Sequence, residues 1–180
     1  IERWLAVRRE HHVRELPALF ALGEWLGAQV PEAGLPAVIH GDYHLDNTLA
    51  SPLEPQILAI IDWELATVGD PYMDVALMLM FWGEYRTQQP PAFTALQSVS
   101  RRSGVISRRE LAGRWSESVG RPLHHMNFYM ALAFWRLAAI IEGAYGLFVT
   151  GQLTTDYARG LEYDVPALLA EAERAAKGDW

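Results

Sequence analysis

Three short apolar runs lie close together in the first half of the sequence, at residues 37–40, 47–50 and 57–62. Each has the length of a strand, and the proline-containing segment 51–55 between the last two is typical of a hairpin turn. Helical patterns precede and follow these runs, without the regular strand–helix alternation that builds a parallel sheet. The sequence therefore predicts an α+β fold that is mostly helical and contains a small β-hairpin sheet.

The helices are predicted from apolar spacing and from residues that begin or end a helix. Residues 10–30 form one amphipathic pattern that stops at Pro31, and Asp70 and Pro71 suit a helix start. The other expected segments are an apolar, buried helix at 72–82, a loop at 84–106, a helix from the capping-box residue Ser107 to 119, a buried core helix at 126–148, and two helices at 154–163 and 166–177.

Two carboxylates and a carboxamide stand where these strands give way to loops. Asp42 follows the first run, Asn47 lies five residues later, and Asp62 ends the third run. Phosphoryl transfer needs an oriented acceptor hydroxyl and a metal that neutralises phosphate charge. One carboxylate can orient the hydroxyl, while a second carboxylate and an amide oxygen suit Mg²⁺, which prefers oxygen ligands. We interpret the three residues as a magnesium-dependent phosphotransferase site.

A longer set of motifs surrounds these residues, and together they resemble one family of kinase-like enzymes. The motifs are His40-Gly41-Asp42, Asn47, Ile61-Asp62-Trp63-Glu64, Gly69-Asp70-Pro71, Asp74, Gly120-Arg121-Pro122 and Phe134-Trp135-Arg136-Leu137-Ala138. In this order they resemble the aminoglycoside phosphotransferase family, and within it the branch associated with acyl-CoA dehydrogenases. The resemblance implies a protein-kinase-like fold, ATP as the phosphoryl donor and Mg²⁺ as the metal.

The resemblance also implies a role for each matching residue. Asp42 would be the catalytic residue that orients the acceptor hydroxyl, and Asn47 and Asp62 would hold Mg²⁺ and, through it, the nucleotide. Asp74 lies one turn into an apolar helix, where an unpaired charge is costly, so we expect it to bond amides of the catalytic loop. The remaining site residues are His40 as structural support and, on the substrate side, Tyr43, His44, Glu64 and Arg136.

Members of this family carry an N-terminal lobe with a phosphate-covering loop and a nucleotide-binding lysine. This sequence supplies neither, and its only lysine is Lys177. We therefore expect residues 1–180 to form a single C-terminal kinase-like lobe whose partner is the missing N-terminal lobe. Its expected parts are a leading helical segment at 1–36, the catalytic and metal loops at 37–83, and a helical acceptor-binding subdomain at 84–180.

The net charge and its distribution along the sequence bear on the expected partner, which is a small-molecule substrate and not nucleic acid. The net charge of −7 does not favour nucleic acid. Residues 1–83 carry 4 basic and 12 acidic side chains, whereas residues 84–121 carry 7 basic and 3 acidic ones. Aminoglycosides are polycations and would favour an acidic acceptor pocket. The resemblance to the branch associated with acyl-CoA dehydrogenases implies instead a hydroxyacyl acceptor, such as a CoA thioester.

Composition bears on the compartment as well. The sequence has no cysteine, which excludes disulfides and thiolate metal sites and leaves a cytoplasmic location as the default. The apolar run at 126–141 has Arg136 near its centre and is shorter than the roughly 20 residues that a membrane span needs. We therefore expect a core helix there and no membrane.

Other interpretations stay open at this point. His40, Asp42 and His44 alternate, and on an extended strand they would share a face, as in the zinc or manganese site of a hydrolase. Arg136 could form a buried ion pair with an acidic residue, or line the acceptor pocket and meet an anion. The missing phosphate loop and lysine also leave a non-catalytic binding or assembly module as an alternative function.

Overall fold

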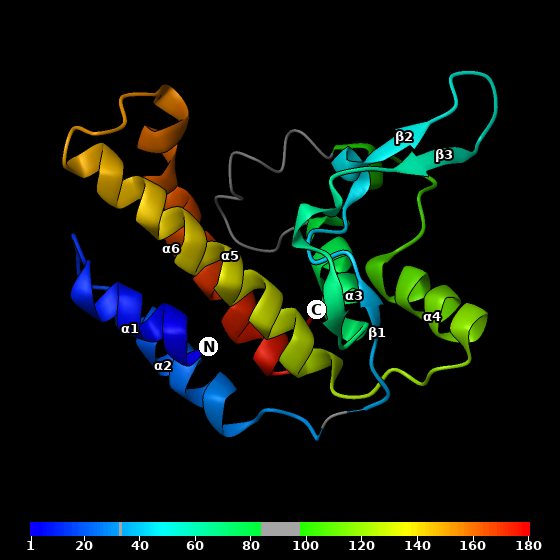
Figure 1. The fold of residues 1–180 in the computed structure, drawn as a ribbon, viewed down its shortest axis with the longest axis horizontal. Helices are drawn as coiled ribbons and strands as arrows, with labels where there is room; N and C mark the ends of the chain where they lie inside the picture. The colour runs from blue at the N-terminus through cyan, green and yellow to red at the C-terminus, as the bar shows by residue number, and fades with distance from the viewer. Residues whose placement is uncertain (33, 84–97) are drawn as a thin grey trace.

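The computed structural model describes residues 1–32, 34–83 and 98–180, and Figure 1 shows α1, α2, α5 and α6 on one side, with the strands, α3 and α4 on the other. The mostly helical α+β architecture is confirmed. Residues 84–97 of the expected loop lie outside the described residues. In chain order the elements are α1 Glu2–Glu10, α2 Pro17–Ala28, β1 Ala37–Ile39, β2 Thr48–Ala50, β3 Ile57–Ile60, β4 Thr67–Gly69, α3 Tyr72–Phe81, α4 Arg108–Val119, α5 Met126–Val149 and α6 Asp156–Ala176, with short 3₁₀ turns at Leu45–Asn47, Trp63–Leu65 and Ser98–Arg101.

The leading segment holds two helices, so the single helix expected at residues 10–30 is wrong. Pro17 begins α2, where its missing N–H costs nothing and its fixed φ suits the first turn. The preceding residue, Leu16, has φ −133° and ψ 70°, outside the helical region that proline disfavours for its neighbour. The apolar spacing is therefore real on α2 but does not extend back through Pro17.

The strands form two separate antiparallel pairs. β2 pairs with β3 as the expected hairpin, with Thr48 opposite Ile60. β1 pairs with β4, with Val38 opposite Val68. The sequence prediction missed β4, because its three residues are too few to show a strand period. This pairing brings the two ends of the segment at 37–69 together, and both the catalytic loop and the Asp62 turn lie between them.

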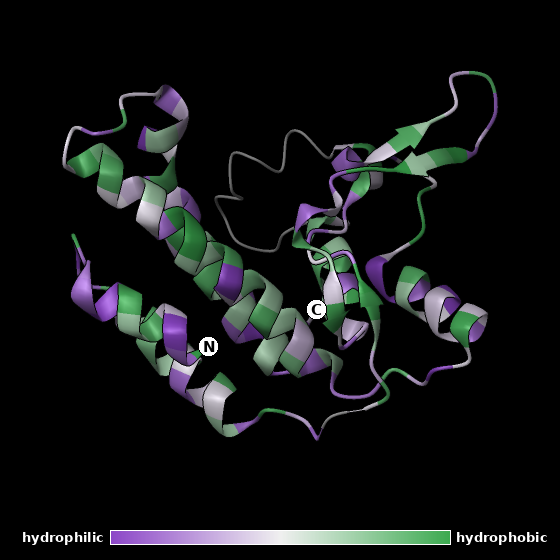
Figure 2. Ribbon diagram, in the orientation of Figure 1, coloured by the Kyte–Doolittle hydropathy of each residue, from purple (hydrophilic) through white to green (hydrophobic). Residues whose placement is uncertain are grey.

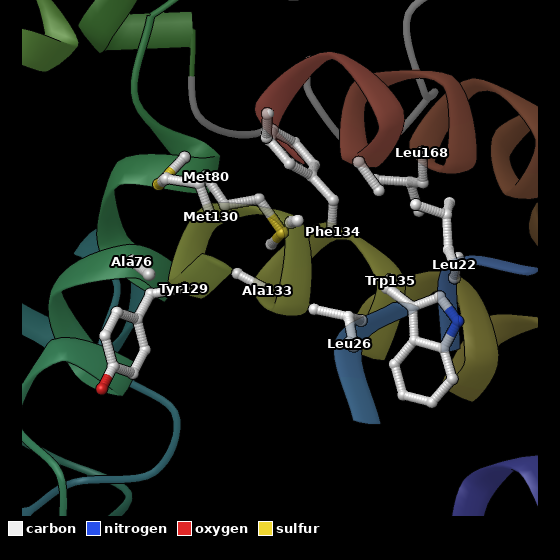
Figure 3. Packing of buried hydrophobic residues seen from close by; sticks show 14 of the residues in the cluster. Leu22, Leu26, Ala76, Met80, Tyr129, Met130, Ala133, Phe134, Trp135 and Leu168 are labelled. Atoms are coloured by element: carbon white, nitrogen blue, oxygen red, sulfur yellow. The ribbon is translucent and has the colours of Figure 1, made fainter. Parts of the chain in front are cut away.

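The core is organised around α5, whose twelve buried residues confirm the expected core helix. Figure 3 shows Ala76 and Met80 of α3 facing Met130 and Ala133 of α5, while side chains of α2 and α6 pack farther along the helix. At 24 residues α5 is long and apolar enough to cross a bilayer by length and composition alone. The sequence argument that this apolar run is too short to span a membrane was therefore wrong. The core position of α5 rests on its buried residues instead.

The last segment is one helix, α6, so the expected break before Pro166 is wrong. Proline has no N–H, which leaves the carbonyl four residues earlier, that of Glu162, without its helical donor. Arg14 supplies the missing bond, since its Nη1 donates to the Glu162 carbonyl at 2.8 Å. The same guanidinium forms a bidentate ion pair with the buried Glu142 of α5. A tertiary contact thus replaces the bond that proline removes.

Helix starts follow the local signals more closely. The Asp70 carboxylate accepts the amide of Tyr72 at 3.0 Å, as expected for a residue at the start of α3. α3 is largely buried on its core side, also as expected. Ser107 and Glu110 form the reciprocal capping box at the start of α4, and Gly120 ends α4 with φ 65°.

Candidate active site

The predicted catalytic loop, residues 40–47, follows β1 and turns back through the 3₁₀ turn at Leu45–Asn47. Asn47 is buried, and its Nδ2 donates to the Asp42 carbonyl oxygen at 2.8 Å and to Asp42 Oδ2 at 3.3 Å. These bonds fix the orientation of the carboxamide, because its N–H side is occupied by Asp42. Asn47 Oδ1 is consequently the atom of this side chain that can face a metal ion.

Asp74 braces the start of the loop from α3. Its Oδ2 accepts the His40 amide at 2.6 Å, and its Oδ1 accepts the Gly41 amide at 2.9 Å. The expected partners of this carboxylate are therefore present. Each oxygen holds one amide, so the loop is attached to the helix that forms part of the core.

Gly41 lies where no other residue fits. Its φ is 84°, in the left-handed region, and a Cβ at this position would lie 2.5 Å from the Leu65 carbonyl oxygen. Leu65 belongs to the 3₁₀ turn at Trp63–Leu65, directly after Asp62. The absence of a side chain therefore lets the catalytic loop pack directly on the Asp62 turn.

His40 joins the two loops through its ring. Asp42 N–H donates to His40 Nδ1 at 3.3 Å, so the tautomer in this arrangement carries its proton on Nε2, which donates to the Ile61 carbonyl at 2.8 Å. Ile61 N–H in turn donates to the Asn47 carbonyl at 3.0 Å. The residue before Asp62 is thus bonded on both sides to the catalytic loop, and His40 has the supporting contacts expected of it.

Asp62 itself adopts φ 67° and ψ 51°, an uncommon conformation for a residue other than glycine. It is exposed, and its carboxylate makes no hydrogen bond or ion pair with the described residues. Such strain is tolerated where surrounding contacts impose it, and the bonds to Ile61 provide them here. The carboxylate is therefore available for a metal ion.

The substrate-side residues differ in how close they lie to Asp42. His44 Nε2 lies 3.6 Å from Asp42 Oδ2, and its ring packs on Phe81 at 5.0 Å between centroids. The Tyr43 ring lies 6.1 Å from the His40 ring. Glu64 is exposed and makes no hydrogen bond or ion pair within the described parts of the chain. Of these residues, His44 is thus the one placed directly against the Asp42 carboxylate.

Two alternatives from the sequence find no support among the described residues. The zinc or manganese site is wrong, because both ring nitrogens of His40 are bonded to the backbone, and no group of three potential ligands forms among the described residues. An ion pair of Arg136 with an acidic side chain is not found among the described residues. Within residues 1–32, 34–83 and 98–180 its one polar contact is with the Gly41 carbonyl, at 3.2 Å from Nη2.

Sequence reasoning missed the aromatic support of the loop. The Trp63 ring packs on the His40 ring at 4.7 Å between centroids, and its Nε1 donates to the Ile60 carbonyl at 2.8 Å. Beside it lies a largely apolar cavity of about 240 Å³, whose lining includes Tyr43, Asp74 and Trp115. The position of Trp63 next to Asp62 was the available signal, whereas Trp115 on α4 is distant in the sequence.

Comparison with known proteins bears directly on this arrangement. Residues 1–104 match the sequence profile of the phosphotransferase enzyme family. The chain belongs to that family. Acyl-CoA dehydrogenase family member 10 from Mus musculus is 31% identical over 160 residues, which cover 86% of this chain and 14% of that protein. Acyl-CoA dehydrogenase family member 11 from Homo sapiens is 32% identical over 146 residues, which cover 79% of this chain and 18% of that protein.

A solved structure supports the fold of this phosphotransferase family member. A protein from Ralstonia eutropha JMP134, provisionally assigned as an aminoglycoside phosphotransferase, superposes with a TM-score of 0.81 at 29% identity. The match covers 98% of this chain and 54% of that one. The expected kinase-like fold and the expected family branch are confirmed. The chain spans about half the length of this structure and less than a fifth of the two curated relatives.

The residues that match the phosphotransferase family include both the catalytic loop and the Asp62 turn. Asp42, Asn47, Asp62 and Asp74 all lie within residues 1–104. Arg136, which contacts the same loop from α5, lies outside the matched range.

Proposed function

We propose that this chain is the catalytic and metal-binding lobe of an ATP- and Mg²⁺-dependent phosphotransferase whose acceptor is an alcohol group of a small molecule. The observation that carries the proposal is the bonding of Asn47 to Asp42 together with the bonding of Ile61 to the same loop. These contacts make Asp42, Asn47 and Asp62 parts of one constellation, although Asp62 lies on a different loop.

In this proposal Asp42 accepts a hydrogen bond from the acceptor hydroxyl and takes its proton as the oxygen attacks the γ-phosphorus of ATP. The bond from the γ-phosphorus to the bridging oxygen breaks, and ADP leaves. Such a transition state needs little covalent help from the protein, so positioning and charge neutralisation supply most of the catalysis. The bonds from Asn47 Nδ2 supply the positioning by restricting Asp42.

The available donor atoms fit a magnesium ion. Mg²⁺ takes oxygen ligands and is commonly bound by one or two protein groups, with waters and substrate phosphates completing six positions. Asn47 Oδ1 and the exposed carboxylate of Asp62 are such donors, and both are left without a partner by the described contacts. When bound, the ion would neutralise phosphate charge. This chain contributes the two oxygens and their orientation.

In the proposal the partner of this chain is an N-terminal kinase-like lobe, and the apolar surface around the strands supports it. Figure 2 shows hydrophobic residues along the strands as well as along α5. A group of large exposed apolar side chains on neighbouring strands is typical of an interface, and the Ralstonia structure has a further 46% of its length outside the match. The exposed side chains are Val38, Leu49, Leu53, Ile57, Leu58, Ile60, Ile61, Trp63, Leu65 and Val68.

The acceptor in this proposal is a hydroxyacyl compound. The basic bias of residues 84–121 favours an anionic acceptor over a polycation. The two curated relatives carry acyl-CoA dehydrogenase in their names, which is consistent with acyl chemistry in the same proteins.

The test uses the whole parent protein with Mg-ATP and hydroxyacyl-CoA or kanamycin as acceptors. Asp42→Asn should keep nucleotide binding and lose at least about a hundredfold in kcat, because the proton acceptor is gone. Asp62→Ala should lose turnover and also bind Mg-ATP more weakly. Glu10→Gln, at the exposed end of α1, is the matched control and should retain full activity.

Two results would reject parts of this proposal. Unchanged turnover in both aspartate variants would end the phosphotransferase assignment. Phosphorylation of kanamycin but not of hydroxyacyl-CoA would end the acceptor assignment alone. If the wild type bound its acceptor but never transferred phosphate, a non-catalytic binding module would describe the chain better.

A further inference from the structure

Gly41 and Asp42 share a peptide unit that is held from both edges. The carbonyl of Gly41 accepts a bond from Arg136 Nη2 at 3.2 Å, and the N–H of Asp42 donates to His40 Nδ1 at 3.3 Å. A peptide unit is planar, so two bonds on opposite edges fix the orientation of the whole plane. The unit before it is held separately, through the Gly41 amide and Asp74.

This plane needs external support because of the residue at its start. Gly41 lies at φ 84° and has no side chain that restricts its rotation. A rotation about its backbone would turn the next peptide plane and redirect the Asp42 side chain. Arg136 is the group that holds the carbonyl edge, and a bond from a charged donor is stronger than one between neutral groups.

Arg136 is unusual for its position on α5. The helix is mainly apolar, and the neighbouring residues Phe134 and Trp135 are buried. A half-buried guanidinium in such surroundings normally pairs with a carboxylate, yet Arg136 has no ion pair with the described residues. Its described bond goes to a carbonyl 95 positions away in the sequence. Arg136 therefore bonds α5 to the catalytic loop.

We propose that Arg136 is a positioning residue, which fixes the peptide plane between Gly41 and Asp42 and thereby the direction of the Asp42 carboxylate. It acts through the Gly41 carbonyl and does not touch the reacting atoms. The α3–α5 core thus holds the loop at two points, with Asp74 at one amide and Arg136 at the following carbonyl. The effect on turnover rests on the proposed function, whereas the effect on loop order does not.

The kinetic test compares Arg136→Met with wild type in the parent protein. The variant should lose about ten- to hundredfold in kcat, as expected for a small misplacement of a catalytic group, while KM for Mg-ATP and for the acceptor change little. Arg136→Lys should recover part of the loss, because it keeps the charge and one donor. Arg9→Met is the control, since Arg9 Nη2 donates to Glu24 Oε1 at 3.1 Å on the exposed surface of α1 and α2, outside the catalytic loop. Its kcat should stay at the wild-type level.

The structural test measures amide hydrogen exchange without substrates. In Arg136→Met the amides of Gly41 and Asp42 should exchange at least about tenfold faster than in wild type, because local opening of the loop becomes easier. Amides of the hairpin at 48–60 should exchange as before. This measurement still tests the proposal if the parent protein shows no turnover, and Arg136→Lys serves if Arg136→Met does not fold.

Three results would overturn the proposal. The first is unchanged exchange at the loop amides. The second is a variant that loses only stability while its folded fraction keeps the wild-type kcat. The third is a large rise in acceptor KM with kcat retained, which would make Arg136 a substrate contact instead.

Discussion

At the scale of single residues, Gly41 has the tightest steric requirement in the loop. Gly41→Ala should destabilise the protein by roughly 1–2 kcal/mol for the left-handed backbone, with an added cost from the contact of its Cβ with Leu65 O. Gly104→Ala is a matched control, since Gly104 has φ 83° and open space around it. Urea unfolding should show the larger loss for Gly41→Ala. Equal losses would mean that the close approach to Leu65 has no energetic consequence.

Tyr129 gives a pH-dependent prediction. Burial and the hydrogen bond that its hydroxyl donates to Asp70 raise the pKa of Tyr129 above the ordinary value of 10.0. Folding therefore favours the neutral phenol. The contribution of Tyr129 to the free energy of unfolding is complete below pH 10 and declines as the pH rises further. Tyr129→Phe should cost about 1 kcal/mol at neutral pH but should lack this alkaline decline.

Urea midpoints at pH 8 and pH 10.5 check this expectation for Tyr129. The difference between wild type and Tyr129→Phe should shrink at the higher pH. A difference that stays constant or grows would show that the phenol does not ionise preferentially in the unfolded chain.

At the scale of elements, Arg14 joins the first two helices to the last two. Arg14→Met should destabilise the protein by about 3–5 kcal/mol, because it leaves the buried carboxylate of Glu142 without a partner. The double variant with Glu142→Gln should recover much of that loss. Arg9→Met is the control, since its pair with Glu24 is exposed and should contribute below about 1 kcal/mol.

Unfolding free energies of the single and double variants form a double-mutant cycle for this pair. If the double variant were as unstable as the sum of the two single variants, the ion pair would not be the source of the effect. The Arg14 bond to the Glu162 carbonyl would then be the better explanation.

Two prolines show what the sequence could and could not predict at this scale. Pro17 begins α2, while Pro166 lies inside α6. Both look alike as local breakers of a helical pattern. They differ because Arg14 reaches the carbonyl that Pro166 leaves unpaired, and that contact joins residues 148 positions apart. Local rules therefore predicted helix starts such as Ser107 well, and failed where a distant residue decided the outcome.

The same distinction holds for the site. Asp42, Asn47 and Asp62 could be singled out as candidates because their spacing is local and their chemistry is specific. The bond between Asp74 and the loop amides was also predictable, since a carboxylate in an apolar helix needs partners. The contact between Arg136 and Gly41 was not, because the resemblance placed Arg136 on the substrate side and no local pattern indicates a bond to a backbone carbonyl 95 positions away.

At the scale of the whole molecule, the core helices bury their apolar side chains, whereas the strands leave many of theirs exposed. α5 and its neighbours form the apolar core (Figures 1 and 3). α3, which is part of that core, holds the loop through the bonds of Asp74 to the His40 and Gly41 amides. The strands instead leave large apolar side chains exposed beside the Asp62 turn. This division agrees with the proposal that the chain is one lobe, which keeps its catalytic loop fixed and presents its strand surface to a second lobe.

The most direct test of the central claim is a crystal structure of the parent protein with Mg²⁺ and a non-hydrolysable ATP analogue. The account predicts a magnesium ion bonded to Asn47 Oδ1 and to the Asp62 carboxylate at about 2.0–2.1 Å, with the γ-phosphate facing Asp42. A nucleotide bound without a metal at these two residues, or a metal held elsewhere on the chain, would contradict it.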